Sequence, residues 1–356
     1  MKDDSMKRVL LLVLSLAALA AVSGCRSGDG AGTGGAASGQ VRLRLGYFPN
    51  LTHAQPLVAL ARGTFRRHLG PKVALETKIF NAGPSAIEAI FANEIDAAYI
   101  GPNPAINGYV KSGGKALRIV AGAMSGGALF VVRPNAGITR PEDLANKKIA
   151  TPQLGNTQDV ALRAYLQDHG LAAKEHGGNV TVLPTANPDI LTLFRKGEIE
   201  GAWVPEPWGT LLVQEGGGKV FLDERDLWPD RKFPTTVLIV RTAFLEQHPD
   251  VVENLLRAHV ETTRFIRDHP EEAKRLINQG IKAITGKELP QRVIDAAWRN
   301  LDVTYEPMAT SLRTCARRAF ALGFLGDKKP DLSGIYALEP LNRVLAELGL
   351  HAVGGD

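Results

Sequence analysis

Strand-like and helix-like segments alternate along the chain from Val41 onward, and this order constrains the fold more than any other feature. The alternation predicts strands over 41–46, 72–80 and 95–100. A helix is expected after each strand, beginning near Thr52, Gly83-Pro84-Ser85 and Asn103-Pro104 respectively. Elements of this length and order are typical of α/β folds with mostly parallel sheets and crossover helices. Ligands of such sheets bind beyond the carboxyl ends of the strands, where helix N-termini gather.

A short internal repeat predicts two lobes built from related βαβ units. Residues 94–102 (EIDAAYIGP) align with residues 198–206 (EIEGAWVPE). Each copy follows a helix that contains a Phe and precedes a helix that starts with a Pro. Before the second copy, residues 183–188 (LPTANP) resemble the earlier strand-to-helix turn. Chance similarity in a short window is the alternative interpretation.

Two apolar segments are the expected crossings between the lobes. Residues 127–133 lead toward the second lobe, and residues 234–241 lead back. The second lobe is then expected over 131–234. The first lobe is discontinuous and takes 41–130 and 235–356. After Arg241 the apolar residues recur at helical spacing, so we expect the C-terminal helices to pack onto the first lobe.

The N-terminus has the pattern of a lipoprotein signal, which we assign to residues 1–24. Lys7 and Arg8 precede an apolar stretch over 9–22, which is too short for an ordinary membrane span. The small residues before Cys25 resemble a bacterial lipobox, which predicts lipidation of Cys25. An ordinary cleaved signal and an anchor helix are the alternatives, and Met1 and Met6 are both possible starts.

The segment 25–40 is rich in Gly, Ala and Ser and is expected to be a flexible tether. It includes a formal GxGxxG, but a dinucleotide-binding fingerprint needs a preceding strand and a following helix. No cofactor is therefore expected. Cys315 has only the lipobox Cys25 as a second cysteine in the chain, so it is expected to be a buried free thiol.

Charge and motif content argue against several classes of function. The formal net charge is +5, without a Lys/Arg run that would suggest a nucleic-acid patch. The eight His residues are scattered, and neither HExxH nor GxSxG occurs. A lipid-anchored hydrolase is thus a distant alternative, and neither an enzyme nor a metal site is expected.

Four ordered motifs resemble the substrate-binding proteins of ABC importers for aliphatic sulfonates, taurine and nitrate. They are GYFPNLTHAQPLVAL, FNAGPSAIEAIFANEIDAAYIGPNPAI, KKIATPQLGNTQDVALRAYL and LFRKGEIEGAWVPEPW, and the resemblance covers roughly 41–270. It implies a two-lobed periplasmic-binding-protein fold of type II, with a small anionic or zwitterionic solute clamped in the cleft. It also implies a monomer on the periplasmic or outer face of the membrane, with an ABC permease and its ATPase as partners.

The stretch GNTQ is the central candidate for solute contact. Asn156, Thr157 and Gln158 stand at the start of a predicted helix, directly after a strand at 148–151, and no Lys, Arg or His lies among them. A sulfonate presents three acceptor oxygens and needs donors, which helix N-termini and neutral side chains supply. The alternative is that Asn156 or Thr157 only caps the helix, with Asp159 as its companion.

The first lobe should contribute the opposite wall of the cleft. Its candidates are helix starts, a turn near the first crossing and the loop after the first strand, namely Gly83, Ser85, Asn103, Ser125, Gly126, Tyr47, Phe48, Asn50, Thr52 and His53. Helix capping, a plain hinge turn and packing beneath the loop are the alternatives for these residues.

Glu206 and Trp208 complete the predicted site and bear on the identity of the solute. A carboxylate at Glu206 would repel a bare sulfonate but attract the ammonium group of taurine; alternatively, it points outward to a hinge or permease residue. Trp208 could form an apolar wall or a core contact. Nitrate and a pyrimidine precursor of thiamine are the alternative ligands, although planar nitrate would leave the aromatic residues little to do.

Overall fold

The computed structural model describes residues 39–355. The predicted signal over 1–24, the lipidation site Cys25 and nearly all of the predicted tether lie outside the described residues. Within 39–355, every helix is too short or too polar to span a lipid bilayer.

The first lobe is built on a six-stranded mixed sheet with the order β11-β4-β10-β3-β1-β2. Strands β2, β1 and β3 are parallel, whereas β10 runs antiparallel to both of its neighbours. The predicted strands in 41–100 are confirmed. The bounds are β1 (Val41–Tyr47), β2 (Val73–Ile79), β3 (Ala97–Ile100), β4 (Leu117–Gly126), β10 (Pro234–Arg241) and β11 (Leu301–Val303).

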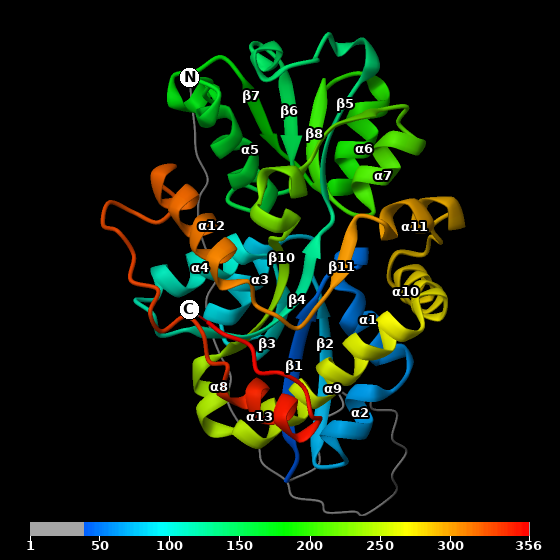
Figure 1. Cartoon of the computed structure of the whole chain (residues 1–356), viewed down its shortest axis with the longest axis vertical. Helices are drawn as coiled ribbons and strands as arrows, with labels where there is room; N and C mark the ends of the chain where they lie inside the picture. Colours follow the sequence, from blue (N-terminus) through cyan, green and yellow to red (C-terminus); the bar gives the residue numbers. More distant parts are fainter. Residues whose placement is uncertain (1–38, 356) are drawn as a thin grey trace, which may run out of the picture.

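The second lobe is built on a five-stranded sheet with the order β7-β6-β8-β5-β9. Strands β7, β6 and β8 are parallel, and β5 runs antiparallel to β8 and β9. The two lobes lie one above the other in Figure 1. The bounds are β5 (Ala128–Val132), β6 (Lys148–Thr151), β7 (Thr181–Pro184), β8 (Gly201–Pro205) and β9 (Lys219–Asp223).

The helices follow the strands as the alternation predicts, with Pro in the first turn of several of them. Their bounds are α1 (Ala54–Ala61), α2 (Thr64–Leu69), α3 (Gly83–Phe91), α4 (Pro102–Lys111), α5 (Thr157–Asp168), α6 (Asn187–Lys196), α7 (Trp208–Gln214), α8 (Thr242–Gln247), α9 (Pro249–Asp268), α10 (Pro270–Thr285), α11 (Gln291–Trp298), α12 (Ala309–Ala321) and α13 (Glu339–Glu347).

The chain crosses between the lobes at β4–β5 and again at β9–β10. At the first crossing, Gly126 and Gly127 have φ values of 72° and 74°. A Cβ atom at Gly127 would lie 2.2 Å from Leu301 Cδ2, so positive φ and close packing both require glycine there. The residue boundaries that we expect for the lobes stay a prediction.

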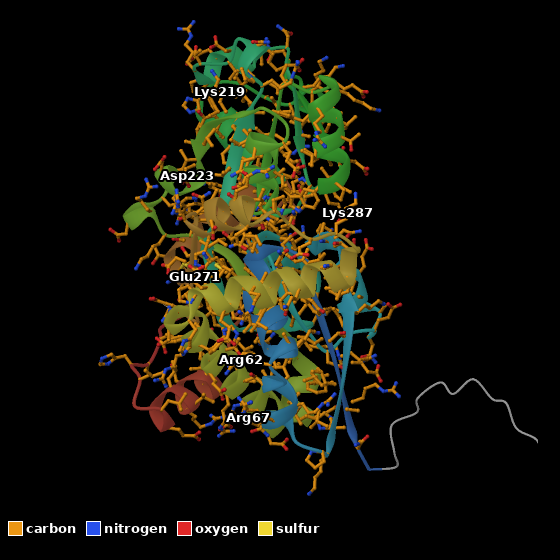
Figure 2. The ribbon with its side chains drawn as sticks, turned by 90° about the vertical axis from the view of Figure 1, so that its right-hand side faces the viewer. Arg62, Arg67, Lys219, Asp223, Glu271 and Lys287 are labelled. Carbon is orange, nitrogen blue, oxygen red and sulfur yellow. The ribbon has the colours of Figure 1, made fainter. Side chains whose placement is uncertain are left out.

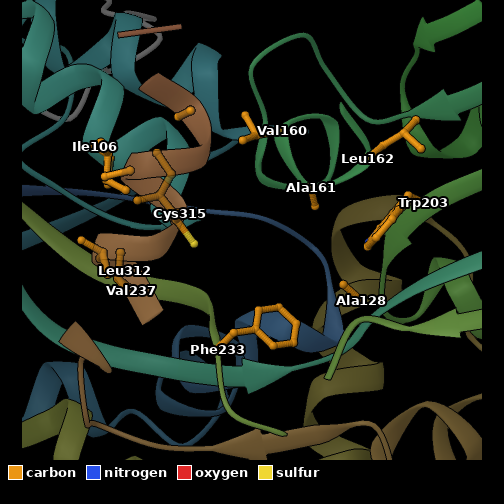
Figure 3. Packing of buried hydrophobic residues seen from close by; sticks show 14 of the residues in the cluster. Ile106, Ala128, Val160, Ala161, Leu162, Trp203, Phe233, Val237, Leu312 and Cys315 are labelled. Atoms are coloured by element: carbon orange, nitrogen blue, oxygen red, sulfur yellow. The ribbon is translucent and has the colours of Figure 1, made fainter. Parts of the chain in front are cut away.

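Two C-terminal helices contact both lobes. Helix α11 packs against α7, and α12 packs against α4 of the first lobe and α5 of the second. Figure 3 shows Leu312 and Cys315 of α12 in the same apolar cluster as Val160 and Ala161 of α5. We expected the C-terminal helices to pack onto the first lobe, but α12 is covered by helices from both lobes. Within residues 39–355, Cys315 is buried and has no disulfide partner, as predicted.

Candidate functional site

A small cavity lies where the carboxyl ends of strands from both sheets face each other. Its volume is about 20 Å³, enough for roughly one water molecule. Its walls come from loops and helix starts of both lobes, so it is an interlobe site. The lining residues are Phe48, Asn50, Thr52, His53, Asn81, Ala82, Gly101, Asn156, Thr157, Gln158, Asn187, Pro205 and Thr235.

The loop after β1 forms the first wall. The Phe48 and His53 rings lie 4.4 Å apart between centroids, and Thr52 Oγ1 lies 3.2 Å from His53 Nδ1. Among the described residues, His53 Nε2 is buried and makes no hydrogen bond of normal geometry, although a weaker backbone interaction with Tyr99 acts on the ring. Burial lowers the pKa of His53 to about 3, so its ring is neutral at physiological pH. If Nδ1 accepts the Thr52 hydroxyl, Nε2 carries the proton and can donate it to a ligand.

The start of α5 forms the opposite wall. Asn156 makes no side-chain cap hydrogen bond; instead its Nδ2 donates to Gln158 Oε1 over 3.2 Å. Asp159 accepts from the backbone N–H of Gly155 at 2.9 Å and from Arg163 Nε at 3.1 Å, so this carboxylate is already paired. Thr157 Oγ1 is buried and has no hydrogen-bond partner in the part of the chain that the structure describes. The hydroxyl is therefore available to a solute.

Asn187 extends this wall from the start of α6. Its Oδ1 is buried without a hydrogen-bond partner. The amide O and N of an Asn are assigned from the surrounding hydrogen bonds, so this side chain can present either an acceptor or a donor. Asn81 lies at the equivalent turn of the first lobe and is exposed at the cavity edge.

The sequence analysis missed six residues of the cavity wall, although one signal was available. Residues 183–188 resemble the turn after β2, so Asn187 and Asn81 lie in corresponding turns, although Asn187 itself matches Gly83 when Pro188 is aligned with Pro84. Gly101, Ala82, Pro205 and Thr235 carry no comparable local signal. Gly101 matters because a Cβ atom there would lie 2.4 Å from Thr157 Oγ1, so the lobes meet at this glycine.

All residues lining the cavity are uncharged, because His53 is neutral. The predicted residues that the structure brings together here are Phe48, Asn50, Thr52, His53, Asn156, Thr157 and Gln158. Two further candidates form contacts across the interlobe gap nearby. Ser85 Oγ donates to Gln153 Oε1 over 3.3 Å, and Trp208 Nε1 donates to Asn50 Oδ1 over 3.1 Å.

The other first-lobe candidates lie outside the cavity wall. Tyr47 is buried in the core of the first lobe, and Gly83 packs so closely against Pro104 that a Cβ atom would lie 2.3 Å from its Cγ. Asn103 Nδ2 donates to the Cys315 carbonyl at 3.4 Å. Ser125 Oγ accepts the backbone N–H of Phe233 at 3.3 Å, and Gly126 belongs to the crossing.

Glu206 is fully buried but does not line the cavity. Its carboxylate accepts hydrogen bonds from the backbone N–H and the hydroxyl of Thr210, at 3.0 and 2.9 Å. Asn300 Nδ2 donates to the same carboxylate over 2.7 Å. Burial raises the pKa of Glu206, and these hydrogen bonds oppose the shift. Glu206 thus ties the end of β8 to the segment before β11.

A larger groove of about 510 Å³ adjoins the cavity and shares Asn50, Asn81 and Asn187 with it. Trp208, Leu211 and Leu289 give this groove apolar walls. Lys287 also lines it and lies near the boundary between the lobes in Figure 2. Asp189, Glu215 and Glu288 also line the groove. The polar cavity and this mixed groove therefore form one continuous region of the interlobe surface.

Comparison with known proteins identifies the family. The model of the NMT1-like family matches residues 36–281. The chain belongs to the NMT1-like family. Among the relatives of this NMT1-like protein, the taurine-binding periplasmic protein of Escherichia coli is 28% identical over 221 residues, which are 62% of this chain. The match spans 66% of that protein, just under two thirds of its length. A putative aliphatic sulfonates-binding protein of Bacillus subtilis is 24% identical over 97% of this chain and 98% of its own.

Solved structures agree with this membership at the level of the fold. The alkanesulfonate-binding protein SsuA of Xanthomonas axonopodis bound to MOPS superposes with a TM-score of 0.71 at 16% identity, over 85% of this chain and all of that chain. The nitrate-binding protein NrtA of Synechocystis superposes with a TM-score of 0.68 at 16% identity, over 87% of this chain and 89% of that chain. The predicted two-lobed periplasmic-binding-protein fold is confirmed.

Proposed function

We propose that this NMT1-like protein captures a small organic sulfonate between its lobes and delivers it to an ABC importer. The observation that carries the proposal is the set of unpartnered buried polar atoms around the cavity: His53 Nε2 from the first lobe, and Thr157 Oγ1 and Asn187 Oδ1 from the second. Buried polar groups are normally hydrogen-bonded, so unpartnered ones that converge from two bodies indicate a ligand site.

The chemistry of these groups suits a strong-acid monoanion. A sulfonate has no proton to donate and offers three equivalent acceptor oxygens. Hydrogen bonds to a charged group contribute about 1.5 to 3 kcal/mol each, and the N-terminus of α5 adds a favourable dipole. A few such donors could reach the roughly 8 kcal/mol of micromolar binding without a Lys or Arg.

The adjoining groove supports a solute with a carbon part. If the sulfonate group of the ligand binds in the polar cavity, the organic part of the ligand points toward Trp208 and Leu211. Nitrate has no carbon part and would leave this groove empty. Nitrate is therefore the second candidate ligand, after a sulfonate. Glu206 gives no support for an ammonium group, because its carboxylate is already bound by Thr210 and Asn300.

Loading must require the lobes to separate, because a cavity of about 20 Å³ cannot hold an organic sulfonate. The Ser85–Gln153 and Trp208–Asn50 contacts would break on opening. The solute-bound closed state must then leave more room between the lobes than the described approach, and it is stabilised by the higher affinity of the solute for it.

A lipid anchor on Cys25 would hold the protein on the extracytoplasmic face, beside its permease and ATPase. The test is mass spectrometry of the N-terminal peptide from protein expressed with its own leader. A diacylglyceryl-modified Cys25 at the mature N-terminus is expected, and a mature chain that starts elsewhere contradicts the anchor.

The solute is tested by thermal unfolding and calorimetry with propanesulfonate, taurine, nitrate and butyrate. Saturating propanesulfonate should raise the melting temperature by several degrees, since a ligand at 100 times its dissociation constant adds about 2.7 kcal/mol. Nitrate and the carboxylate should give smaller shifts. A shift with nitrate alone would favour the second candidate, and no shift with any of the four would contradict the assigned site.

A further inference from the structure

A second cavity, much larger than the interlobe one, lies on the outer side of α12. Its volume is about 1090 Å³, and its walls come from α12, the segment 329–338, α13 and the last described residues. Leu312, Ala316 and Phe320 line the groove from α12 as an apolar row, at a spacing of four residues. Leu312 and Ala316 are largely buried in the apolar cluster, and Phe320 is half-buried. Leu332 and Ile335 line the facing wall. We call this cavity the α12 groove.

One edge of the α12 groove is basic. Arg313 and Arg317 each follow a residue of the apolar row, and both are exposed. Arg313 Nη1 donates to the Gly355 carbonyl at 3.2 Å, and Arg317 Nη2 donates to the Thr314 hydroxyl at 2.7 Å. These partners are neutral, so most of the donor capacity of both guanidinium groups remains available. With Lys329, three cations line the groove against one carboxylate, Glu339.

Tyr336 adds a polar group inside the groove. Its hydroxyl oxygen is buried and has no hydrogen-bond partner among the described residues. Tyr336 and Arg313 line the same cavity, and burial raises the pKa of Tyr336 while the positive charge of Arg313 opposes this shift. The hydroxyl is therefore protonated at neutral pH and can donate a hydrogen bond beside the guanidinium group.

We propose that the α12 groove is a second ligand site, which binds an amphiphilic monoanion of the alkyl carboxylate class. The carboxylate pairs with Arg313 and Arg317 and accepts the Tyr336 hydroxyl, while the alkyl chain lies along the apolar row. Arg matches the two oxygens of a carboxylate in a bidentate geometry. An apolar pocket with a few convergent polar groups is the usual form of a small-molecule site, and the volume of this cavity lies slightly above the usual range. This site is independent of the proposed sulfonate function.

Calorimetry with octanoate tests the proposal on the whole mature chain. The test variant is Arg313→Gln/Arg317→Gln. The matched control is Arg66→Gln/Lys72→Gln, which also removes two exposed cations: Arg66 lies in α2, and Lys72 follows that helix. We expect one octanoate per chain, at least tenfold weaker binding in the test variant and unchanged binding in the control. Octan-1-ol, which has the same chain without the charge, should bind at least tenfold more weakly than octanoate.

Three outcomes overturn the proposal: octanoate fails to bind the wild-type chain saturably, both double variants lose affinity equally, or octanol binds as well as octanoate. Thr157→Val distinguishes the two sites, because it should leave octanoate binding unchanged. Loss of octanoate binding in Thr157→Val, with no effect of the arginine substitutions, would place the ligand between the lobes instead. Failure at the α12 groove leaves the sulfonate proposal intact, because no residue of this groove lines the interlobe cavity.

Discussion

At the residue scale, the interlobe cavity depends on polar groups that lack partners and on the absence of charge in its walls. Asp159 would repel an anion at the start of α5, but Arg163 and the backbone of Gly155 hold its carboxylate, and Thr151 Oγ1 donates to it at 2.9 Å. Neutral donors therefore meet the solute, and a fixed ion pair lies behind them. This arrangement avoids the large cost of burying an unpaired cation whenever the site is empty.

Thr157→Val removes one donor from the site and keeps the shape of the side chain. We expect sulfonate affinity to fall about tenfold to a hundredfold, because a hydrogen bond to a charged group contributes roughly 1.5 to 3 kcal/mol. The melting temperature of the unliganded protein should stay the same or rise, since the hydroxyl has no partner to lose. Calorimetry and thermal unfolding measure the two effects. Unchanged affinity would remove Thr157 from the site.

His53 should make the stability of the protein depend on pH. Its pKa is about 3 in the folded chain against an ordinary 6.5, so the unfolded chain binds a proton that the folded chain does not. The contribution of His53 to stability is present above pH 6.5 and is lost as the pH falls toward 3, by about 1.4 kcal/mol per pH unit.

The His53→Asn variant tests this dependence by urea unfolding at pH 6.5 and pH 5. The stability advantage of the wild type over the variant should shrink by about 2 kcal/mol between these pH values. His351→Asn, at an exposed position, is the control and should leave the dependence unchanged. Equal pH dependence in the wild type and His53→Asn would show that His53 titrates normally in the folded chain.

At the element scale, α12 connects the lobes through a short helix of the second one. The 3-10 helix η5 (Glu224–Leu227) buries Glu224, which accepts the indole N–H of Trp203 at 2.8 Å. Arg318 of α12 lies over the ring of Trp228, 4.7 Å from its centroid. Burial raises the pKa of Glu224 to about 7, and the hydrogen bond from Trp203 and the charge of Arg318 oppose the shift. The carboxyl group therefore titrates near neutral pH at a contact between lobes.

The wild type should lose stability as the pH rises above 5, and Glu224→Gln should not show this loss. Because the folded pKa exceeds the ordinary 4.5, the contribution of Glu224 is complete below pH 4.5 and is lost as the pH rises through 7. Between pH 5 and pH 8, the wild type should lose roughly 2 to 3 kcal/mol relative to Glu224→Gln. Urea unfolding measures this difference. Glu246→Gln, at an exposed position, is the control, and parallel behaviour of both variants would contradict the assignment.

At the scale of the whole molecule, the two lobes touch so closely that one glycine limits their approach. Gly101 has φ −67° and ψ 153°, a conformation open to any residue, so its importance is not conformational. It matters because a Cβ atom would lie 2.4 Å from Thr157 Oγ1 on the other lobe. A side chain at position 101 would fit into the described approach only if the Thr157 hydroxyl moved away.

Gly101→Ala should therefore hold the lobes apart without unfolding either one. Without ligand, small-angle scattering should give a larger radius of gyration for Gly101→Ala than for the wild type. Affinity for propanesulfonate should fall at least tenfold, because the added methyl group crowds the Thr157 hydroxyl. Gly101→Ala/Thr157→Ala should regain the compact form but not the affinity, because the clash and the donor are both removed. Equal radii for Gly101→Ala and the wild type would show that this contact does not limit closure.

The sequence by itself determined the local structure and one wall of the candidate site. Apolar periodicity and Gly-Pro turns predicted the strands and helix starts, because these signals act between near neighbours along the chain. The polar run at 156–158 was predicted to face the cleft, and it lines the interlobe cavity. The repeat around residues 94 and 198 matches two strands, β3 and β8, that occupy equivalent places in the two sheets.

Only the tertiary structure decided which distant residues meet. Glu206 and Asn300, Gly101 and Thr157, and α12 with α4 and α5 come together through the packing of whole lobes, which leaves no local pattern in the chain. The same packing decides which polar atoms stay without partners: Thr157 and Asn187 are ordinary helix-start residues in sequence. They become candidate ligand contacts because the opposite lobe excludes water from them and offers no hydrogen bond in its place.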